Sequence, residues 1–272
     1  MQTGKYKMLV TDLDDSLLGH DLRISSSDKD ALLTAARKGI IVTIATGRMF
    51  SSTLPYIKEL GIDVPVITYQ GAVIKGLLSN ETLIHIPIEN DMSRDLIRES
   101  KKDGYHIQAY IDDEYYIEQE NEHSDHYKMI SGQPGIVIED LEECADKGVT
   151  KFIIIDKPDK VLELRDRYAD LYGDSLQVTI SRPNFLEFTH IDATKGNAIK
   201  YLAQKFGIDR RDIIAIGDSY NDISMIEYAG LGVAMGNAPE DIKSIADYVT
   251  LKNSESGVAH VVERFILGGV IS

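Results

Sequence analysis

Short, continuous apolar runs recur along the chain, and each is followed by a polar or glycine-rich turn. The runs are Met8–Val10, Ile40–Ile44, Val66–Thr68 and Ile213–Ile216. Such runs are typical of strands buried on both faces of a parallel sheet. Between the first two runs, residues Ser27–Lys38 carry apolar side chains at helical spacing, with serines available as N-caps. The alternation of strand and helix predicts an α/β fold with a doubly wound, mainly parallel, Rossmann-like sheet.

The pattern changes in the middle of the chain. Alternating strand patterns, HIQAYIDD, YYIEQ, KFIIID, LQVTI and FLEF, are interleaved there with helices such as Val161–Tyr172, and no catalytic-looking turn separates them. We interpret this segment as an inserted α+β cap domain at 87–187. It divides a core made of 1–86 and 188–272, with linkers near Ile86 and Phe188.

The polar signatures of the core all follow strands. They are the acidic turn TDLDDSLL from Thr11, ATGR from Ala45, the turn Tyr69–Ala72 and GDSYND from Gly217. In open parallel sheets, ligands bind outside the carboxyl ends of the strands. We therefore expect these four turns to converge on one crevice.

Composition narrows the classes of partner. The chain has 272 residues with a net charge of -15, which argues against nucleic acid because phosphate backbones select basic surfaces. It has one cysteine, Cys144, which we expect to be a small, partly buried residue in a protein without a disulfide framework. No apolar run approaches membrane-spanning length, and we expect a cytoplasmic protein with no membrane partner.

The acidic turn predicts a cation site or covalent chemistry. Asp12, Asp14 and Asp15 are like charges that resist ionising together, and Asp218 and Asp222 add a second acidic pair. Carboxylate oxygens are the ligands that Mg²⁺ prefers, usually together with a substrate phosphate. A carboxylate beside such an ion can act as a nucleophile, and a second one can protonate a leaving oxygen and later activate water.

Two further segments carry groups suited to a phosphoryl ligand. Thr46 supplies a hydroxyl, and Gly47 lets the backbone approach a ligand where the next helix opens. Lys195, just before a predicted helix, would offset the charge that develops in phosphoryl transfer. By contrast, GLGVAMG from Gly230 lacks the glycine spacing of a dinucleotide-binding turn, and we predict a strand and a tight turn there.

Taken in order, these motifs resemble the haloacid dehalogenase superfamily of phosphohydrolases, and within it the Cof-type branch, whose large cap is inserted between the second and third motifs. The resemblance covers essentially the whole chain. The motifs that carry it are DLDDSLL, ATGR, TKGNAIKYL, GDSYND and GLGVAMGNAPE.

The resemblance implies a role for each matching residue. Asp12 would be the nucleophile and a Mg²⁺ ligand, Asp14 the acid/base and a backbone-carbonyl ligand, and Asp218 the third ligand. The phosphoryl group would be bound by Lys195 and by a set of four further residues: Leu13, Thr46, Gly47 and Asn221. Asp222 would support Lys195 or the waters on the metal.

The chain departs from the usual family pattern at three positions. Ser16 stands where the family mostly has Thr and keeps the hydroxyl, so we assign it a supporting role. Asp15 replaces a frequent Gly, and Gln70 takes the place of a common Asn before Gly71. The last change leaves residue 70 without a predicted role.

The cap is expected to supply substrate specificity, as lids over phosphoryl sites do. Arg182 and Glu187 are our candidates, with the loop Asp112–Glu114, and ordinary surface charge is the alternative for all of them. His123 and His126 have a weak metal-ligand spacing, but no further Cys or His partner is evident, and a solvated cap helix is the preferred interpretation.

The leading hypothesis is a Mg²⁺-dependent phosphatase that acts on small phosphorylated metabolites, sugar phosphates or similar, through an aspartyl-phosphate. A phosphosugar mutase or phosphotransferase is one alternative, and a non-catalytic phospho-ligand sensor is another. The intact set of Asp12, Asp14, Lys195 and Asp218 argues against the sensor. We expect a monomer or a weak homodimer.

Overall fold

The structure is a computed structural model that describes residues 5–61, 63–77 and 81–268. The chain forms two compact units. The first comprises Met1–Thr46, Thr53–Leu83 and Thr194–Ser272, and the second comprises Gly47–Ser52 and Ile84–Ala193. None of the described helices is both long enough and apolar enough to cross a membrane.

The first unit is built on a parallel sheet with the strand order β14-β13-β12-β1-β2. Every pairing between neighbouring strands in this sheet is parallel. The strands are β1 (Met8–Thr11), β2 (Ile41–Ile44), β12 (Ile213–Gly217), β13 (Leu231–Ala234) and β14 (Tyr248–Val249). The helices are α1 (Ser26–Arg37), α2 (Phe50–Leu60), α6 (Lys195–Phe206), α7 (Ile223–Tyr228), α8 (Glu240–Ile245) and α9 (Gly257–Phe265).

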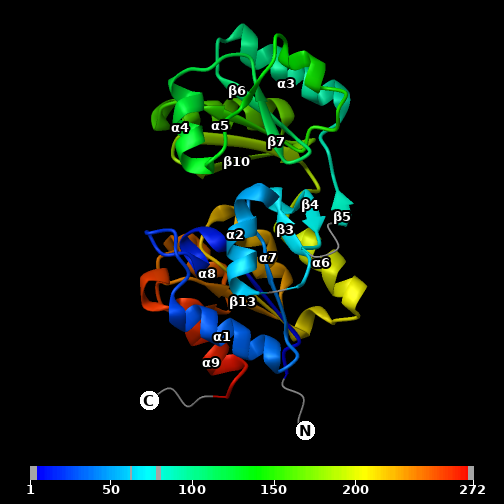
Figure 1. The fold of residues 1–272 in the computed structure, drawn as a ribbon. Coiled ribbons are helices and arrows are strands. Elements are labelled where there is room, and N and C mark those ends of the chain that lie inside the picture. The colour runs from blue at the N-terminus through cyan, green and yellow to red at the C-terminus, as the bar shows by residue number, and fades with distance from the viewer. Residues whose placement is uncertain (1–4, 62, 78–80, 269–272) are drawn as a thin grey trace. The chain divides into compact units, whose positions relative to one another are not determined.

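The strand order makes this sheet doubly wound. From β1 the chain moves through α1 to β2 at one edge, and from β12 it moves through α7 and α8 towards β14 at the other. Because such crossovers are right-handed, opposite directions of travel place α1 and α7 on opposite faces. Helices α1 and α9 lie side by side (Figure 1). The predicted fold class is confirmed.

The third predicted strand is not part of this parallel sheet. Strand β3 (Val66–Thr68) pairs antiparallel with β4 (Val73–Lys75) in a separate sheet of order β3-β4-β5, where β5 is Thr82–His85. A single parallel bridge, Ala45 to Ile67, links β3 to the chain just after β2. The tight turn after β3 sends the chain straight back, so β3 gains an antiparallel partner in place of a crossover helix.

The second unit is a sheet of order β10-β11-β9-β6-β7-β8. Its strands are β6 (Ile107–Ile111), β7 (Glu114–Ile117), β8 (Ile136–Val137), β9 (Lys151–Ile155), β10 (Leu176–Arg182) and β11 (Phe185–His190). Its helices are α3 (Asn90–Lys102), α4 (Glu122–Ser131) and α5 (Pro158–Tyr172). Phe188, where we expected a linker, lies inside β11 and pairs with Val178 and Phe152. The alternating pattern continues through Thr189, and the chain leaves this unit only after Ala193.

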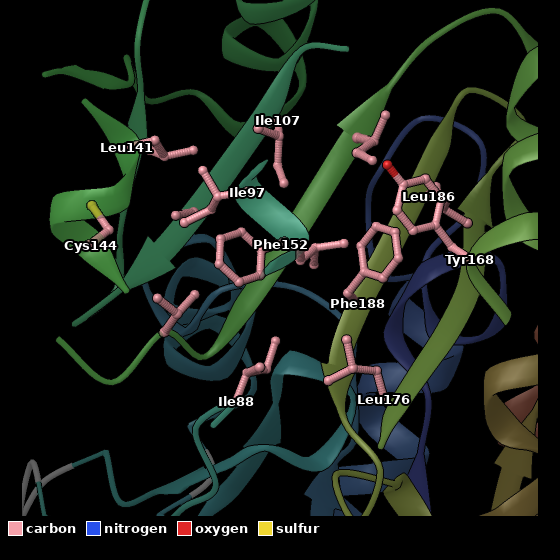
Figure 2. Packing of buried hydrophobic residues seen from close by; sticks show 14 of the residues in the cluster. Ile88, Ile97, Ile107, Leu141, Cys144, Phe152, Tyr168, Leu176, Leu186 and Phe188 are labelled. Carbon is pink, nitrogen blue, oxygen red and sulfur yellow. The ribbon is translucent and has the colours of Figure 1, made fainter. Parts of the chain in front are cut away.

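One face of this second sheet forms an apolar core with α3 and α5. Alternate strand residues such as Phe152, Leu186 and Phe188 point into it and meet Leu96 and Tyr168 from the helices. Figure 2 shows this packing, with Cys144 among the buried side chains. The thiol is fully buried, a stronger burial than the sequence predicted.

Helix α4 is attached to the second sheet through a histidine. The Asn121 side chain caps α4, because its Oδ1 accepts from the backbone N–H groups of His123 (3.0 Å) and Ser124 (3.1 Å). Its Nδ2 therefore donates to His106 Nδ1, 3.0 Å away, and this bond requires that Nδ1 carry no proton. Burial, with the nearby His123 ring, lowers the pKa of His106 to about 4. His123 is half-buried and stacks on His106, so it is not a fully solvated side chain.

We expect His106 to make the protein acid-sensitive. Its folded pKa lies below its usual 6.5, so its contribution to the free energy of unfolding is complete above pH 6.5 and is lost as pH falls towards 4. The loss is on the order of 2 kcal/mol after allowance for partial exposure. Urea unfolding at stepped pH measures it. In His106→Asn, which keeps a neutral acceptor, the free energy of unfolding should fall less over this interval. The exposed control His20→Asn should follow the wild type, and identical slopes for all three would contradict the assignment.

Candidate active site

Two acidic residues lie where the winding direction of the parallel sheet reverses. Asp12 follows β1 and Asp218 follows the neighbouring strand β12. The Asp12 backbone N–H donates to the Ile216 carbonyl at 2.8 Å, which fixes the two strand ends together. Ser16, fully buried, donates from Oγ to Asp218 Oδ1 at 2.9 Å. In such sheets ligands bind outside the carboxyl ends of the strands, and carboxylates line that position here.

Lys195 joins the two sides of this acidic group. It is the first residue of α6, whose N-cap Thr194 accepts from the Asn197 N–H. Its ammonium is fully buried and donates to Asp12 Oδ1 at 2.5 Å and to Asp222 Oδ1 at 2.6 Å. A buried ammonium is tolerated only when it is paired and hydrogen-bonded, and these two carboxylates meet that need.

Asp222 has both carboxylate oxygens engaged. While Oδ1 accepts from Lys195, Oδ2 accepts from the backbone N–H groups of Asp218 (2.9 Å) and Ser219 (3.0 Å). The side chain fits because Gly217 has none of its own: a Cβ there would lie 2.5 Å from the Asp222 Cβ. Asp222 therefore holds both Lys195 and the turn that carries Asp218.

Close packing fixes the start of α6 from two directions. A Cβ on Gly71, which has φ +110°, would lie 2.3 Å from the Thr194 carbonyl oxygen. A Cβ on Gly196 would lie 2.3 Å from the Ser224 carbonyl oxygen, and the Gly196 N–H donates to Ser224 Oγ at 3.1 Å. Both positions require glycine, and together they set how deeply Lys195 reaches into the acidic group.

Burial and mutual repulsion shape the protonation of the cluster. Burial raises the pKa of Asp12, and the charges of Asp222, Asp218 and Asp14 raise it further, while Lys195 opposes them. Burial likewise raises the pKa of Asp218, with Asp222 adding to it. Burial alone would lower the pKa of Lys195, but Asp12 and Asp222 more than offset this and raise it. The lysine stays charged, whereas Asp12 and Asp218 resist full ionisation until a cation offsets the cost of their burial and their mutual repulsion.

This group fits a divalent cation. Asp12, Asp218 and Asp222 can each present a carboxylate oxygen within 4.8 Å of the others, and no other such group of three metal-ligating side chains occurs among the described residues. Three carboxylates beside one ammonium supply hard oxygen donors, which suit a hard divalent cation. With both Asp222 oxygens engaged, Asp12 and Asp218 are better placed than Asp222 to bind it. Asp14 is half-buried, and its role at the metal stays a prediction.

The predicted phosphate-binding residues are distributed over both units. Leu13 and Thr46 are buried in the first unit, where the Thr46 carbonyl accepts from the Gln70 N–H at 3.1 Å. Asn221, also in the first unit, donates from Nδ2 to Gln70 Oε1 at 2.9 Å. Gly47 belongs to the second unit, where its carbonyl accepts from Lys151 Nζ at 3.1 Å. Hydrogen bonds thus link the four turns that follow β1, β2, β3 and β12. The hydrogen bond that Gly47 accepts from Lys151 is instead made within the second unit.

The two candidates for specificity differ in their surroundings. Glu187 is buried in β11, where its Oε1 accepts from Ser181 Oγ at 2.6 Å and lies 3.4 Å from Lys151 Nζ. Arg182 is half-buried at the end of β10. Of the loop Asp112–Glu114, Asp113 Oδ2 accepts from the Ser51 N–H at 2.7 Å, at the start of α2. Glu187 is therefore not ordinary surface charge, and its role in specificity stays a prediction.

Three residues contribute to the site without having had a predicted role of their own. Gln70 contacts Asn221, Gly71 packs against Thr194, and Ser224 binds the amide after Lys195. A signal for the first two was present, since Tyr69–Gly71 follows a strand as the catalytic turns do. Nothing in the sequence pairs residue 70 with residue 221.

Comparison with known proteins shows the family to which the chain belongs. The family model of haloacid dehalogenase-like hydrolases matches residues 9–262. The phosphatase YwpJ of Bacillus subtilis is 31% identical over 291 residues, covering 96% of this chain and 100% of YwpJ.

Two solved structures are similar over nearly their whole length. TM0651 from Thermotoga maritima has a TM-score of 0.84 and 35% identity, covering 95% of this chain and 97% of that one. The sugar phosphatase BT4131, described as a subclass IIB member, has a TM-score of 0.83 and 28% identity, covering 95% of this chain and 98% of that one.

Removal of the buried ammonium should destabilise the metal-free protein. Lys195→Met leaves Asp12 and Asp222 buried without their cation, and we expect the free energy of unfolding to fall by about 3 kcal/mol. Urea unfolding in chelator measures the change. Lys200→Met, on the exposed face of the same helix, is the matched control and should change it by less than about 0.5 kcal/mol. Equal effects of the two substitutions would show that Lys195 does not hold the cluster together.

Proposed function

The chain belongs to the haloacid dehalogenase-like hydrolases and is a phosphatase of that family, and we propose that it uses Mg²⁺ and an aspartyl-phosphate on Asp12 to hydrolyse small phosphorylated metabolites. The observation that carries the proposal is the buried contact of Lys195 Nζ with Asp12 Oδ1, 2.5 Å long, beside Asp218. A buried carboxylate that an ammonium holds at the carboxyl end of a strand is oriented for attack on a phosphorus atom.

In the first step, an Asp12 carboxylate oxygen forms a bond to phosphorus as the bond to the substrate's ester oxygen breaks. Asp14, protonated, gives its proton to that leaving oxygen, and the alcohol departs. Lys195 keeps Asp12 in place and counters the negative charge of the phosphoryl group. Thr46, with the amides of Leu13 and Gly47 and the side chain of Asn221, binds the phosphoryl oxygens.

In the second step, Asp14 takes a proton from water, and the water oxygen bonds to phosphorus as the bond to Asp12 breaks. Inorganic phosphate leaves and the Asp12 carboxylate is restored. Mg²⁺, held by Asp12, Asp218 and the Asp14 carbonyl, would neutralise charge on the phosphoryl oxygens. Ser16 and Asp222 fix Asp218 through the hydrogen bonds described above.

Sugar phosphates are the substrates we favour. The support is the likeness to BT4131, described as a sugar phosphatase, over 95% of this chain. We further propose that the inserted residues 87–187 act as a cap that selects the leaving group, with Arg182 and Glu187 among its recognition residues. The family resemblance supports this role.

We expect Mg²⁺-dependent phosphate release from a panel of sugar phosphates, nucleotides, flavin mononucleotide and pyridoxal phosphate. Chelator should abolish release, and Asp12→Asn, which lacks the nucleophile, should lower kcat/KM by at least about 1,000-fold. The matched control Asp15→Asn changes an exposed carboxylate in the same turn and should keep most of the activity.

Two outcomes would contradict the proposal. Release that survives in Asp12→Asn would exclude the aspartyl-phosphate. If no substrate releases phosphate, isomerisation of a sugar monophosphate in the presence of its bisphosphate would identify a mutase instead.

A further inference from the structure

The turn after β3 is held in an unusual backbone conformation. Tyr69, Gln70 and Gly71 have φ angles of +51°, +60° and +110°, so two non-glycine residues in succession adopt the left-handed region. Left-handed backbone is strained in non-glycine residues, and such strain persists only where the surroundings over-determine it. Strain of this kind clusters at functional sites, so the contacts of the turn identify what it serves.

Three contacts fix the backbone of Gln70. Its N–H donates to the Thr46 carbonyl at 3.1 Å, and the Ala72 N–H closes the turn on the Tyr69 carbonyl at 3.0 Å. The next residue, Gly71, packs against Thr194 with no space for a side chain. The backbone from which the buried Gln70 side chain extends is therefore fixed between Thr46 and the start of α6.

That side chain meets Asn221, which directly precedes Asp222. Asn221 Nδ2 donates to Gln70 Oε1 at 2.9 Å. With Gln70 Oε1 facing Asn221, the other amide orientation of Asn221 would set two carbonyl oxygens against each other, so the orientation of Gln70 determines that of Asn221. In that orientation Asn221 Oδ1 is buried and has no hydrogen-bond partner among the described residues.

We propose that Gln70 is a positioning residue: it holds the Asn221 amide so that Oδ1 accepts a hydrogen bond from a donor that arrives with the ligand. The proposal rests on the phosphatase function above, whose ligands bring such donors. A buried acceptor without a partner is destabilising, and a donor that binds there recovers that energy. Two donors have this chemistry: a water carried by Mg²⁺, or a hydroxyl of a singly protonated phosphate.

Calorimetric titration of the full chain distinguishes the two donors without turnover. Mg²⁺ alone is titrated first, and inorganic phosphate at pH 6 is titrated with Mg²⁺ saturating. Gln70→Met keeps the length of the side chain but removes the acceptor. We expect Gln70→Met to weaken binding about tenfold. If the donor is a water on Mg²⁺, the Mg²⁺ titration shows the loss. If the donor is a hydroxyl of the phosphate, only the phosphate titration shows it.

A double-mutant cycle separates positioning from a merely structural role. Asn221→Ala should weaken the same titration in the wild type and in Gln70→Glu, which keeps an acceptor of equal reach. In Gln70→Met it should add nothing, because the amide is already released. Gln204→Met, on the exposed face of α6, is the matched control and should bind both ligands like the wild type.

Independent, multiplicative effects of Gln70→Met and Asn221→Ala would overturn the proposal, and so would unchanged binding in Gln70→Met. Thermal unfolding of each variant identifies one that fails to fold, and Gln70→Leu, which also lacks the acceptor, then replaces Gln70→Met in the cycle. The proposed function is tested separately by phosphate release. A wild type that shows the coupling but releases no phosphate would disprove the phosphatase and leave the role of Gln70 standing.

Discussion

The burial of one ammonium between Asp12 and Asp222 is the interaction on which the catalytic unit depends. The three residues lie at positions 12, 195 and 222 of the chain, and their side chains meet at 2.5 and 2.6 Å. Desolvation of an ammonium costs several kcal/mol, and only a short, doubly paired geometry offsets this cost. The glycines at 71, 196 and 217 follow from that demand, because each removes a side chain that would keep these segments apart.

Topology explains why such distant residues can meet. The chain winds in opposite directions from β1 and β12, and the ends of these neighbouring strands are the place where connecting loops diverge and leave room for polar side chains. Asp12 and Asp218 occupy the two ends, and α6 brings Lys195 to them after the whole second unit has intervened. The insertion is compatible with the site because the start of α6 is fixed by contacts within the first unit, at Gly71 and Ser224.

Much of this arrangement could be predicted from the sequence, because buried parallel strands and polar turns leave distinct local patterns. Met8–Val10 and Ile213–Ile216 became β1 and β12, and the motif acids lie together as expected. Val66–Thr68 has the same pattern as those strands, yet pairs antiparallel with β4, because its partner is set by the turn that follows. The contact between Gln70 and Asn221 joins residues 151 positions apart, and local pattern contains no information on such a pair.

The charge balance of the cluster also bears on the order of binding. The chain carries a net charge of -15, and Lys195 is already paired with two carboxylates, so its ammonium attracts a phosphate dianion only weakly in the metal-free cluster. Both Asp222 oxygens are engaged, which leaves the oxygens of Asp12 and Asp218 as the negative charge that a cation would neutralise. On the proposed function, attraction of the phosphate therefore depends on prior neutralisation of these two residues. The hydrogen bond from Ser16 and the contact of Asp222 with the Asp218 amide keep Asp218 in place. The carboxylate that would bind the cation is therefore oriented before the cation or the phosphate arrives.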